Sequence, residues 1–167
     1  MTSVLVSHSN VRLELIVAGQ SDRTTISNLI QLYLYDMASD VPFPVGDDGT
    51  YEYGMLGQFW EHPYLIKVDG ELAGFALVIS RCPITETSPC WFMAEFFVLR
   101  PYRRRAIGTA VFDAVKVRHP GLWHIATALH NNAGESFWAK IIDGTVCETT
   151  FSSFDGMEWI VRTFKTN

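Results

Sequence analysis

Patterns that would mark a metal site, a disulfide framework or a membrane span are missing from this sequence. Its three cysteines (Cys82, Cys90 and Cys147) are odd in number and have no CxxC spacing, which favours reduced thiols over disulfides or a zinc site. The five histidines follow no HxxxH or Cys/His ligand pattern. No apolar run approaches the roughly 20 residues that a membrane helix needs. We therefore expect no metal and no membrane partner.

Positive charge is also scarce. The chain has 13 Lys and Arg against 18 Asp and Glu, a formal net charge of −5. This balance disfavours nucleic acid as the main partner, because phosphate binding needs a basic surface, and it suits cationic or neutral small molecules. The opening MTSVLVSHSN has neither a basic n-region nor a long apolar h-region, so we expect a cytoplasmic protein rather than an exported one.

Apolar residues, in contrast, are plentiful enough for one folded domain. They make up 48% of the 167 residues, so we expect a single domain over residues 1–167. Hydrophobic periodicity predicts strands at 11–18, 64–68, 72–79, 91–99, 122–129, 147–152 and 157–164. It predicts helices from a cap at Ser21 or Asp22 to about residue 34, then around 55–61, at 109–118 and at 132–142. Asp69-Gly70 between two apolar runs predicts a hairpin. The result is an α+β fold.

A long segment from residue 39 to about 62 interrupts this pattern with prolines, glycines, acids and aromatics. Irregular segments of this length are uncommon in compact domains and often bind ligands. Carboxylates among aromatic rings suit a cationic amine, so Tyr35, Tyr53 and Trp60 are candidate substrate-binding residues. A plain surface loop with solvated acids remains the alternative.

The most informative stretch is 94–115, where a strand enters a basic turn that opens directly into a helix. Such a turn presents unpaired backbone N–H groups and the positive end of the helix dipole, so it attracts an anion. Arg103, Arg104 and Arg105 add charge suited to a phosphate group, and Gly108 lets the backbone approach it. Walker A and GxGxxG loops are absent. A solvated charge run is the alternative, disfavoured because the arginines lie between strand and helix.

This turn resembles the signature of the Gcn5-related N-acetyltransferase (GNAT) superfamily, Arg/Gln-x-x-Gly-x-Gly/Ala. Residues 103–108 read RRRAIG, with Ala106 where the first glycine is usual. A second stretch, Asn131 to Trp138 (NNAGESFW), resembles the family's Asn-x-x-Ala-x-x-Phe-Tyr, with Gly134 at the usual alanine and Trp138 at the usual tyrosine. The order of strands and helices over 11–164 also matches, and the whole sequence looks like a small, poorly characterised bacterial branch of the superfamily.

The resemblance implies a mixed, mostly antiparallel sheet of about six to seven strands, flanked by helices and splayed between the fourth and fifth strands. It implies acetyl-CoA as cofactor, with the pyrophosphate on the backbone of the turn, the pantetheine along the fourth strand and beside Asn131, and the thiol next to the last helix. Homodimers are frequent in the family, although nothing in the sequence fixes an interface. The cofactor-binding residues that it implies are Phe97, Val98, Arg100, Arg103, Arg104, Arg105, Ala106, Ile107, Gly108, Thr109, Asn131, Phe137 and Trp138.

For chemistry, the resemblance implies direct transfer of an acetyl group from acetyl-CoA to a primary amine of a small molecule. Glu95 interrupts the apolar strand at 91–99 and is the candidate base, because a carboxylate among apolar neighbours can have its pKa raised toward neutrality. Solvent exposure of Glu95 is an equal alternative. The Val98 N–H is a candidate donor to the thioester oxygen. Trp138 cannot supply a proton as a tyrosine would, so a non-catalytic acyl-CoA-binding module is the alternative function. A structural domain without cofactor is a weaker one.

Overall fold

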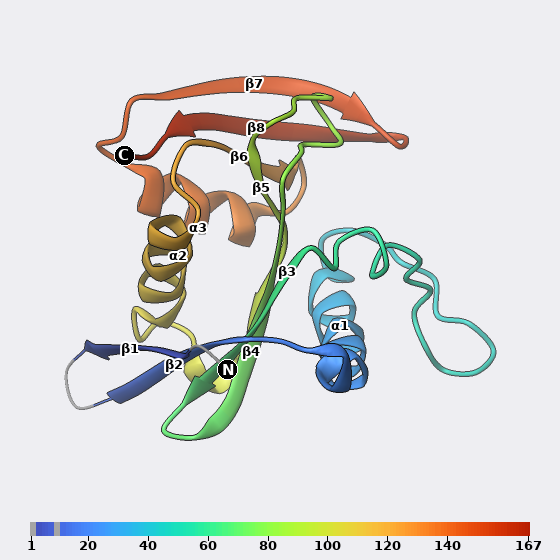
Figure 1. Ribbon diagram of the computed structural model, residues 1–167. Helices are drawn as coiled ribbons and strands as arrows, with labels where there is room; N and C mark the ends of the chain where they lie inside the picture. Colours follow the sequence, from blue (N-terminus) through green and yellow to red (C-terminus); the bar gives the residue numbers. More distant parts are fainter. Residues whose placement is uncertain (1–2, 9–10) are drawn as a thin grey trace.

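One eight-stranded sheet forms the centre of the molecule (Figure 1). The computed structural model describes residues 3–8 and 11–167, with side chains from residue 11 onward. The strands are β1 (Ser3–His8), β2 (Val11–Val17), β3 (His62–Val68), β4 (Glu71–Ile79), β5 (Trp91–Val98), β6 (Leu122–Ala128), β7 (Cys147–Phe154) and β8 (Met157–Lys165). The α-helices are α1 (Arg23–Met37), α2 (Ile107–Arg118) and α3 (Asn132–Ile142).

The sheet has the order β1-β2-β3-β4-β5-β6-β8-β7, and β5–β6 is its parallel contact among otherwise antiparallel pairs. The parallel contact covers only Trp91 opposite Trp123 and Phe92 opposite His124. Beyond Phe92 the two strands separate. The predicted α+β class and the splay between the fourth and fifth predicted strands are therefore confirmed. The additional strand is β1, which pairs with β2 along its whole length.

Helices cover both faces of this sheet. In Figure 1, α1 and the long loop after it lie on one side of the central strands, and α2 and α3 lie on the other. The apolar face of α1 packs on Phe75 and Leu77 of β4, whereas α2 and α3 pack on Ala76 and Val78 of the same strand. Successive strand residues point to opposite faces, so β4 contributes to both cores and is buried from Ala73 onward.

Local signals in the sequence were mostly reliable. Asp69 and Gly70 have φ values of 53° and 86°, as a two-residue turn with left-handed positions requires, which confirms the hairpin. Asp22 does not cap α1 with its side chain; its carboxylate accepts from the Gly19 N–H at 2.8 Å in a short 3-10 turn before the helix. The helix predicted around 55–61 is wrong. A single turn forms there, with the Phe59 N–H donating to the Met55 carbonyl at 3.0 Å.

Candidate active site and cofactor-binding turn

A β-bulge in β5 determines where Glu95 points. Leu77 of β4 lies opposite Glu95, but the next residue, Val78, lies opposite Met93, so Ala94 is the extra residue. Met93 packs with α2 and α3, whereas Ala94 and Phe97 pack on the α1 side. A bulge places two successive residues against one on the partner strand and re-aims the side chains that follow. Glu95 therefore faces α1.

Two tyrosines enclose the Glu95 carboxylate. The Tyr53 hydroxyl donates to its Oε1 at 2.8 Å, and Tyr33 of α1 also forms a side-chain hydrogen bond with it. Burial raises the pKa of Glu95 from its ordinary value to about 7, although the hydrogen bonds from Tyr33 and Tyr53 favour the charged form and limit the rise. Glu95 is thus half-buried and partnered, and it titrates in the range where a carboxylate can act as a general base.

Tyr33 is a residue of the candidate site that the sequence analysis did not single out. It lies on the inner face of α1, and its ring packs on Phe97 and Phe75, with centroid distances of 5.6 and 6.1 Å. Helical spacing assigned it to the apolar face, which is correct for the ring. Nothing in that spacing indicates that its hydroxyl meets a carboxylate on a different element.

The three candidate substrate-binding residues lie in different places. Tyr53 contacts Glu95. Tyr35 is 69% exposed and faces solvent. Trp60 packs under Arg23, whose guanidinium carbon lies 5.1 Å from the ring centroid. Arg23 and Tyr33 are ten residues apart on α1, about 15 Å along its axis, so Trp60 packs near the start of the helix. Of the three, Tyr53 is the one whose side chain forms a hydrogen bond with the candidate base.

The splay leaves the inner edge of β5 open. The Leu99 N–H donates to the Ala73 carbonyl on β4 at 2.8 Å. Because successive amides of an antiparallel strand point to opposite sides, the amides of Phe96 and Val98 point away from β4, toward the gap before β6. The Val98 carbonyl accepts from the Arg103 Nε at 2.7 Å. The Val98 N–H therefore points into the gap, and its role as a donor to the thioester oxygen stays a prediction.

The turn between β5 and α2 contains two left-handed residues. Arg104 has a φ of 59° and Ala106 a φ of 57°, and α2 begins directly afterward at Ile107. Ala106 precedes the first helical residue and makes no side-chain cap. The first backbone N–H groups of α2 have no acceptor within the helix, so they need hydrogen-bond acceptors from elsewhere. The left-handed φ of Ala106 explains why glycine is the easier residue at this position.

Asp36 of α1 binds two arginines of this region. Its Oδ1 accepts from the Arg100 Nε at 2.6 Å, and its Oδ2 lies 2.6 Å from a terminal nitrogen of Arg103. Burial opposes ionisation, but the hydrogen bonds from Arg103 and Arg100 lower the pKa of Asp36. Arg103 also lies over the Phe97 ring, 5.4 Å from its centroid. Arg100 and Arg103 therefore attach α1 to the end of β5, a role that the sequence reasoning did not assign to them.

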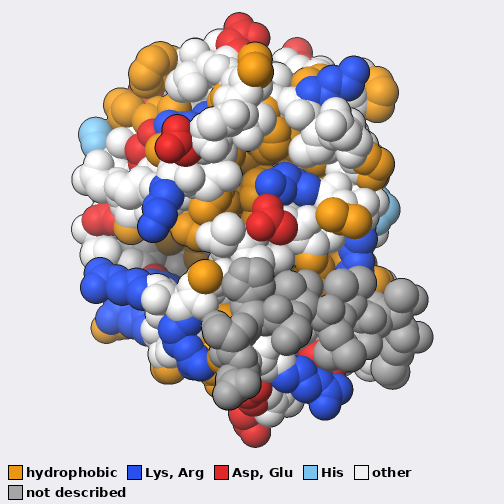
Figure 2. Space-filling view, turned by 90° about the vertical axis from the view of Figure 1, so that its left-hand side faces the viewer, with side chains coloured by type: hydrophobic (Ala, Val, Ile, Leu, Met, Phe, Trp, Pro, Cys, Tyr) orange, Lys and Arg blue, Asp and Glu red, His pale blue; other side chains and the backbone are white. Residues whose placement is uncertain are grey.

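Arg104 and Arg105 are placed differently. Both are exposed, and neither takes part in any ion pair found among the described residues. Figure 2 shows Lys and Arg side chains gathered on the lower part of the α2 and α3 side, at the height at which α2 begins in Figure 1. These two arginines are the charges of the turn that remain available to an anion.

Gly108 allows a close approach between two helices within the protein. A Cβ on Gly108 would lie 2.9 Å from two atoms of the Phe137 ring. That ring stacks on Phe96, with centroids 5.7 Å apart and planes inclined by 16°. Gly108 thus lets the start of α2 meet α3, which is a different use from the backbone approach to a phosphate that we predicted.

Trp138 lies in the core and not at an open surface. It is 7% exposed and packs against Phe112 and Phe96, with centroid distances of 5.1 and 5.4 Å. Phe137 is half-buried beside it. Of the pair predicted to flank the thiol, Phe137 is therefore the more accessible.

Asn131 caps α3. Its side-chain oxygen accepts from the Gly134 N–H at 2.9 Å, the N-cap arrangement expected of asparagine. A Cβ on Gly134 would lie 2.7 Å from the Asn131 amide nitrogen, so glycine at 134 makes room for this cap. The predicted hydrogen bond from Asn131 to a pantetheine remains a prediction. The cap uses the side-chain oxygen, so the side-chain nitrogen would be the donor.

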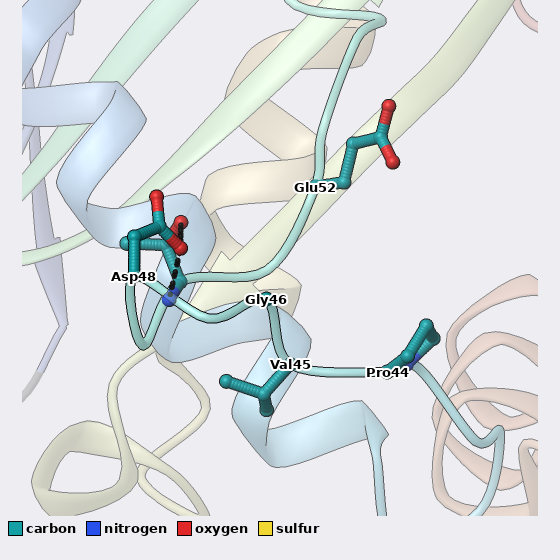
Figure 3. A pocket seen from close by; sticks show the side chains of 6 residues that line it. Pro44, Val45, Gly46, Asp48 and Glu52 are labelled. Atoms are coloured by element: carbon teal, nitrogen blue, oxygen red, sulfur yellow. Dashed lines mark hydrogen bonds between the residues drawn. The ribbon is translucent and has the colours of Figure 1, made fainter.

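A shallow hollow of about 340 Å³ opens in the long loop and is lined by Pro44, Val45, Gly46, Asp48, Thr50 and Glu52. Figure 3 shows that Glu52 points away from Asp48, whose Oδ1 accepts from the Thr50 N–H at 3.0 Å and the Thr50 hydroxyl at 2.8 Å. The hollow includes neither Glu95 nor any residue of the arginine turn. Within residues 3–8 and 11–167, no group of three His, Cys, Asp or Glu side chains is arranged to hold a metal ion. In the same part of the chain, no helix is long and apolar enough to cross a membrane.

The fold is similar to that of solved acetyltransferases. A GNAT-family acetyltransferase from Listeria monocytogenes superimposes with a TM-score of 0.64 at 11% identity, covering 96% of this chain and 100% of that chain. An N-acetyltransferase from Staphylococcus aureus gives 0.61 at 14% identity, covering 89% and 98%. The ribosomal-protein-S18-alanine N-acetyltransferase from Escherichia coli gives 0.56 at 13% identity, covering 93% and 94%.

These identities show a shared fold and not a shared substrate. No curated protein sequence matches the chain. The sequence model of the Acetyltransferase (GNAT) family matches residues 29–142, a range that includes Tyr33, Glu95, the arginine turn and Asn131. The chain therefore belongs to the GNAT acetyltransferase family.

Proposed function

We propose that this protein transfers an acetyl group from acetyl-CoA to a primary amine of a small molecule. The observation that carries the proposal is the Glu95 carboxylate, aimed by the bulge of β5 at the α1 side and titrating near pH 7. A group with this pKa can accept a proton from an ammonium ion at neutral pH. Glu95 also lies on β5, the strand that borders the gap before β6, beyond the last residue of β5 that pairs with β6.

The residues of this chain fit acetyl-CoA. Arg104 and Arg105 would lie beside its phosphates, with the amides of residues 106–109 at the start of α2. The Phe96 and Val98 amides, turned away from β4, would face its pantetheine arm in the gap. Arg103, bound to Asp36 and to the Val98 carbonyl, would shape that edge and not bind phosphate itself.

The chemistry follows from these positions. Acetyl-CoA, when bound, supplies a thioester carbonyl and a thiolate leaving group. Glu95 accepts a proton from the acceptor ammonium, directly or through a water molecule, and the amine nitrogen then bonds to the carbonyl carbon as the C–S bond breaks. The nitrogen loses a second proton as it becomes the amide, and that proton passes to the departing thiolate or to solvent. The Val98 N–H would stabilise negative charge on the carbonyl oxygen. Tyr33 and Tyr53 hold the Glu95 carboxylate in one orientation.

The acceptor class follows from the surroundings of Glu95. Its neighbours on the α1 side are the rings of Tyr33, Tyr53 and Phe97, and a carboxylate among aromatic rings suits a cationic amine. Two solved relatives act on proteins by their descriptions, on ribosomal protein S18 and on ribosomal L7/L12. A peptide with a free N-terminus therefore belongs in the acceptor panel beside small amines. The cytoplasmic location and a homodimer remain predictions.

A non-catalytic acyl-CoA-binding module is the second candidate. The observation that favours it is Trp138, which fills the position of the family's tyrosine and is buried in the core. Both candidates require cofactor binding, and only the first requires turnover.

The experiment has two stages. Calorimetric titration with acetyl-CoA is done on the wild type and on Arg104→Glu/Arg105→Glu, with Lys140→Glu/Lys165→Glu as a control of equal charge change on exposed residues elsewhere. We expect micromolar binding by the wild type and the control, and at least tenfold weaker binding by the arginine variant. Release of free thiol from acetyl-CoA is then followed with the acceptor panel. Binding without release of thiol by any amine would favour the module, and no binding by the wild type would refute both candidates.

A further inference from the structure

Side-chain hydrogen bonds from Gln31 of α1 hold one turn of the long loop. Val45 and Tyr51 form an isolated antiparallel bridge, and within it the Gly46 N–H donates to the Thr50 carbonyl at 2.8 Å. This turn meets α1 at Gln31. The Gln31 side-chain nitrogen donates to the Tyr51 carbonyl at 3.0 Å, and the Tyr51 N–H donates to the Gln31 side-chain oxygen at 2.7 Å.

A glutamine is well suited to this contact. Its side-chain amide has a donor and an acceptor at the same end, so it pairs with both backbone groups of Tyr51 much as a neighbouring strand would. Both residues are half-buried, so losing one partner leaves polar groups with reduced access to water. Apart from this bridge, the loop has no helix or strand from residue 38 to residue 61. Holding so long a segment in one conformation costs conformational entropy, which the Gln31 hydrogen bonds help to offset.

Tyr53 follows two residues after this attachment point. Two residues of extended chain span about 7 Å, so the position of the Tyr51 backbone limits where the Tyr53 side chain can reach. Tyr53 is the loop residue whose hydroxyl donates to Glu95. We propose that Gln31 is a positioning residue for the candidate base, because its amide fixes Tyr51 on α1 and thereby holds Tyr53 over the Glu95 carboxylate. The inference rests on the proposed function for the meaning of Glu95, but the contact itself can be tested without any substrate.

The titration of Glu95 reports on this arrangement. The titratable groups that face Glu95 are Tyr33 from α1 and Tyr53 from the loop. Removing only the hydroxyl, in Tyr53→Phe, keeps the ring in place and takes away a bond to the charged form, so the pKa of Glu95 rises. Releasing the loop, in Gln31→Ala, admits water to the carboxylate. Burial is the largest cause of the raised pKa, so the pKa of Glu95 then falls.

The test is a ¹³C NMR titration of the Glu95 carboxyl in protein labelled at glutamate, with Glu95→Gln used to assign the signal. Gln31→Ala is compared with Asn28→Ala, the same kind of truncation one turn earlier on α1 at an exposed residue. Alanine favours the helix at both positions, so both variants are expected to fold, which far-UV circular dichroism checks. We expect Gln31→Ala to lower the midpoint by about one pH unit and Asn28→Ala to leave it unchanged. Gln31→Glu keeps only the acceptor for the Tyr51 N–H and should give a smaller decrease.

Two results would overturn the inference: an unchanged midpoint in Gln31→Ala, which would mean that the loop stays closed without Gln31, or an equal change in Asn28→Ala. A rise in the Gln31→Ala midpoint, as in Tyr53→Phe, would mean that Tyr53 has left the carboxylate while the carboxylate stays buried, and it would support the positioning role. Failure of the proposed function is a separate outcome, because it appears as absent acetyl-CoA binding or turnover while the titration of Glu95 is unaffected. Where turnover is found, the low-pH limb of kcat/KM should move to lower pH in Gln31→Ala together with the NMR midpoint.

Discussion

The proposed base should cost stability, and Glu95→Gln measures that cost. Burial raises the pKa of Glu95 from an ordinary value of 4.5 to about 7. Each pKa unit corresponds to about 1.4 kcal/mol, so the ionised carboxylate destabilises the native state by up to about 3 kcal/mol. Glutamine has nearly the same shape and never ionises, and its oxygen can still accept one tyrosine hydrogen bond. Allowing for partial solvent access and one lost hydrogen bond, we expect a gain of about 1–2 kcal/mol at pH 8.

The sign depends on pH. Because the folded-state pKa of Glu95 lies above the unfolded value, its favourable contribution is fully present below about pH 4.5 and is lost as pH rises through 7. Glu95→Gln should therefore match the wild type or be slightly less stable at pH 5, and be more stable at pH 8. Turnover should fall at least a hundredfold in the same variant, since the proton acceptor is gone.

Urea unfolding followed by circular dichroism, at pH 5 and pH 8, gives the free energies of unfolding for this comparison. Glu52→Gln is the control, because it makes the same change at an exposed carboxylate of the loop; its difference from the wild type should not change between the two pH values. If Glu95→Gln is destabilised equally at pH 5 and pH 8, Glu95 is not a buried carboxylate with a raised pKa. The assignment of the base would then be refuted on physical grounds, before any acceptor is known.

Three further predictions concern the frame of the site. Ala106→Gly should relieve the left-handed φ of 57° and stabilise the protein by about 1 kcal/mol, or 2–4 °C in Tm; an unchanged or lower Tm in calorimetry would contradict the strain. Asp36→Asn leaves two arginines without their shared carboxylate and should cost about 1–2 kcal/mol in thermal unfolding. Asp113→Asn, which removes an exposed partner of Lys116, should cost almost nothing. Equal losses of stability in the Asp36 and Asp113 variants would contradict this prediction. Burial, with His62 and Arg118 nearby, lowers the pKa of His119 to about 4. The neutral ring therefore stabilises the fold above about pH 6.5, and this contribution should be about 2–3 kcal/mol smaller at pH 4. His119→Gln should show no such loss in urea unfolding, and the same pH dependence in the wild type and the variant would refute the prediction.

Much of the fold followed from local patterns, because periodicity and turn chemistry act within a few residues. The hairpin at Asp69-Gly70 and the strand, turn and helix from 91 to 118 are examples. The direction of Glu95 did not follow. Along a regular strand it would share a face with Met93, and only the extra residue at Ala94 turns it toward α1. A bulge depends on pairing with the neighbouring strand, so the sequence of β5 alone does not decide to which face of the sheet Glu95 points.

The partners within the site are equally non-local. Asp36 and Arg103 are 67 positions apart, and Tyr53 and Glu95 are 42 apart. Composition marked the loop as rich in acids and aromatics but ranked Tyr35 and Trp60 beside Tyr53. The structure separates them, because α1 turns Tyr35 to solvent and Trp60 lies near the opposite end of the helix. The arginine turn was recognised as a unit, yet Asp36 binds Arg103 together with Arg100 just before the turn, whereas Arg104 and Arg105 form no ion pair among the described residues.

Trp138 at the position of the family's tyrosine is weaker evidence against catalysis than Glu95 is evidence for it. A proton donor to the leaving group matters most when that group is a poor anion. A thiol has a pKa of about 8.5, so a thiolate can leave near neutral pH without a donor at position 138. The attacking amine has no such freedom, because an ammonium nitrogen has no lone pair and must first lose a proton. The step that needs a protein group is therefore deprotonation of the amine. The candidate group in this chain is the Glu95 carboxylate, which has a pKa near 7 and is held by Tyr33 and Tyr53. The candidate base Glu95, more than the loss of the tyrosine, is therefore the feature that a turnover assay should examine first.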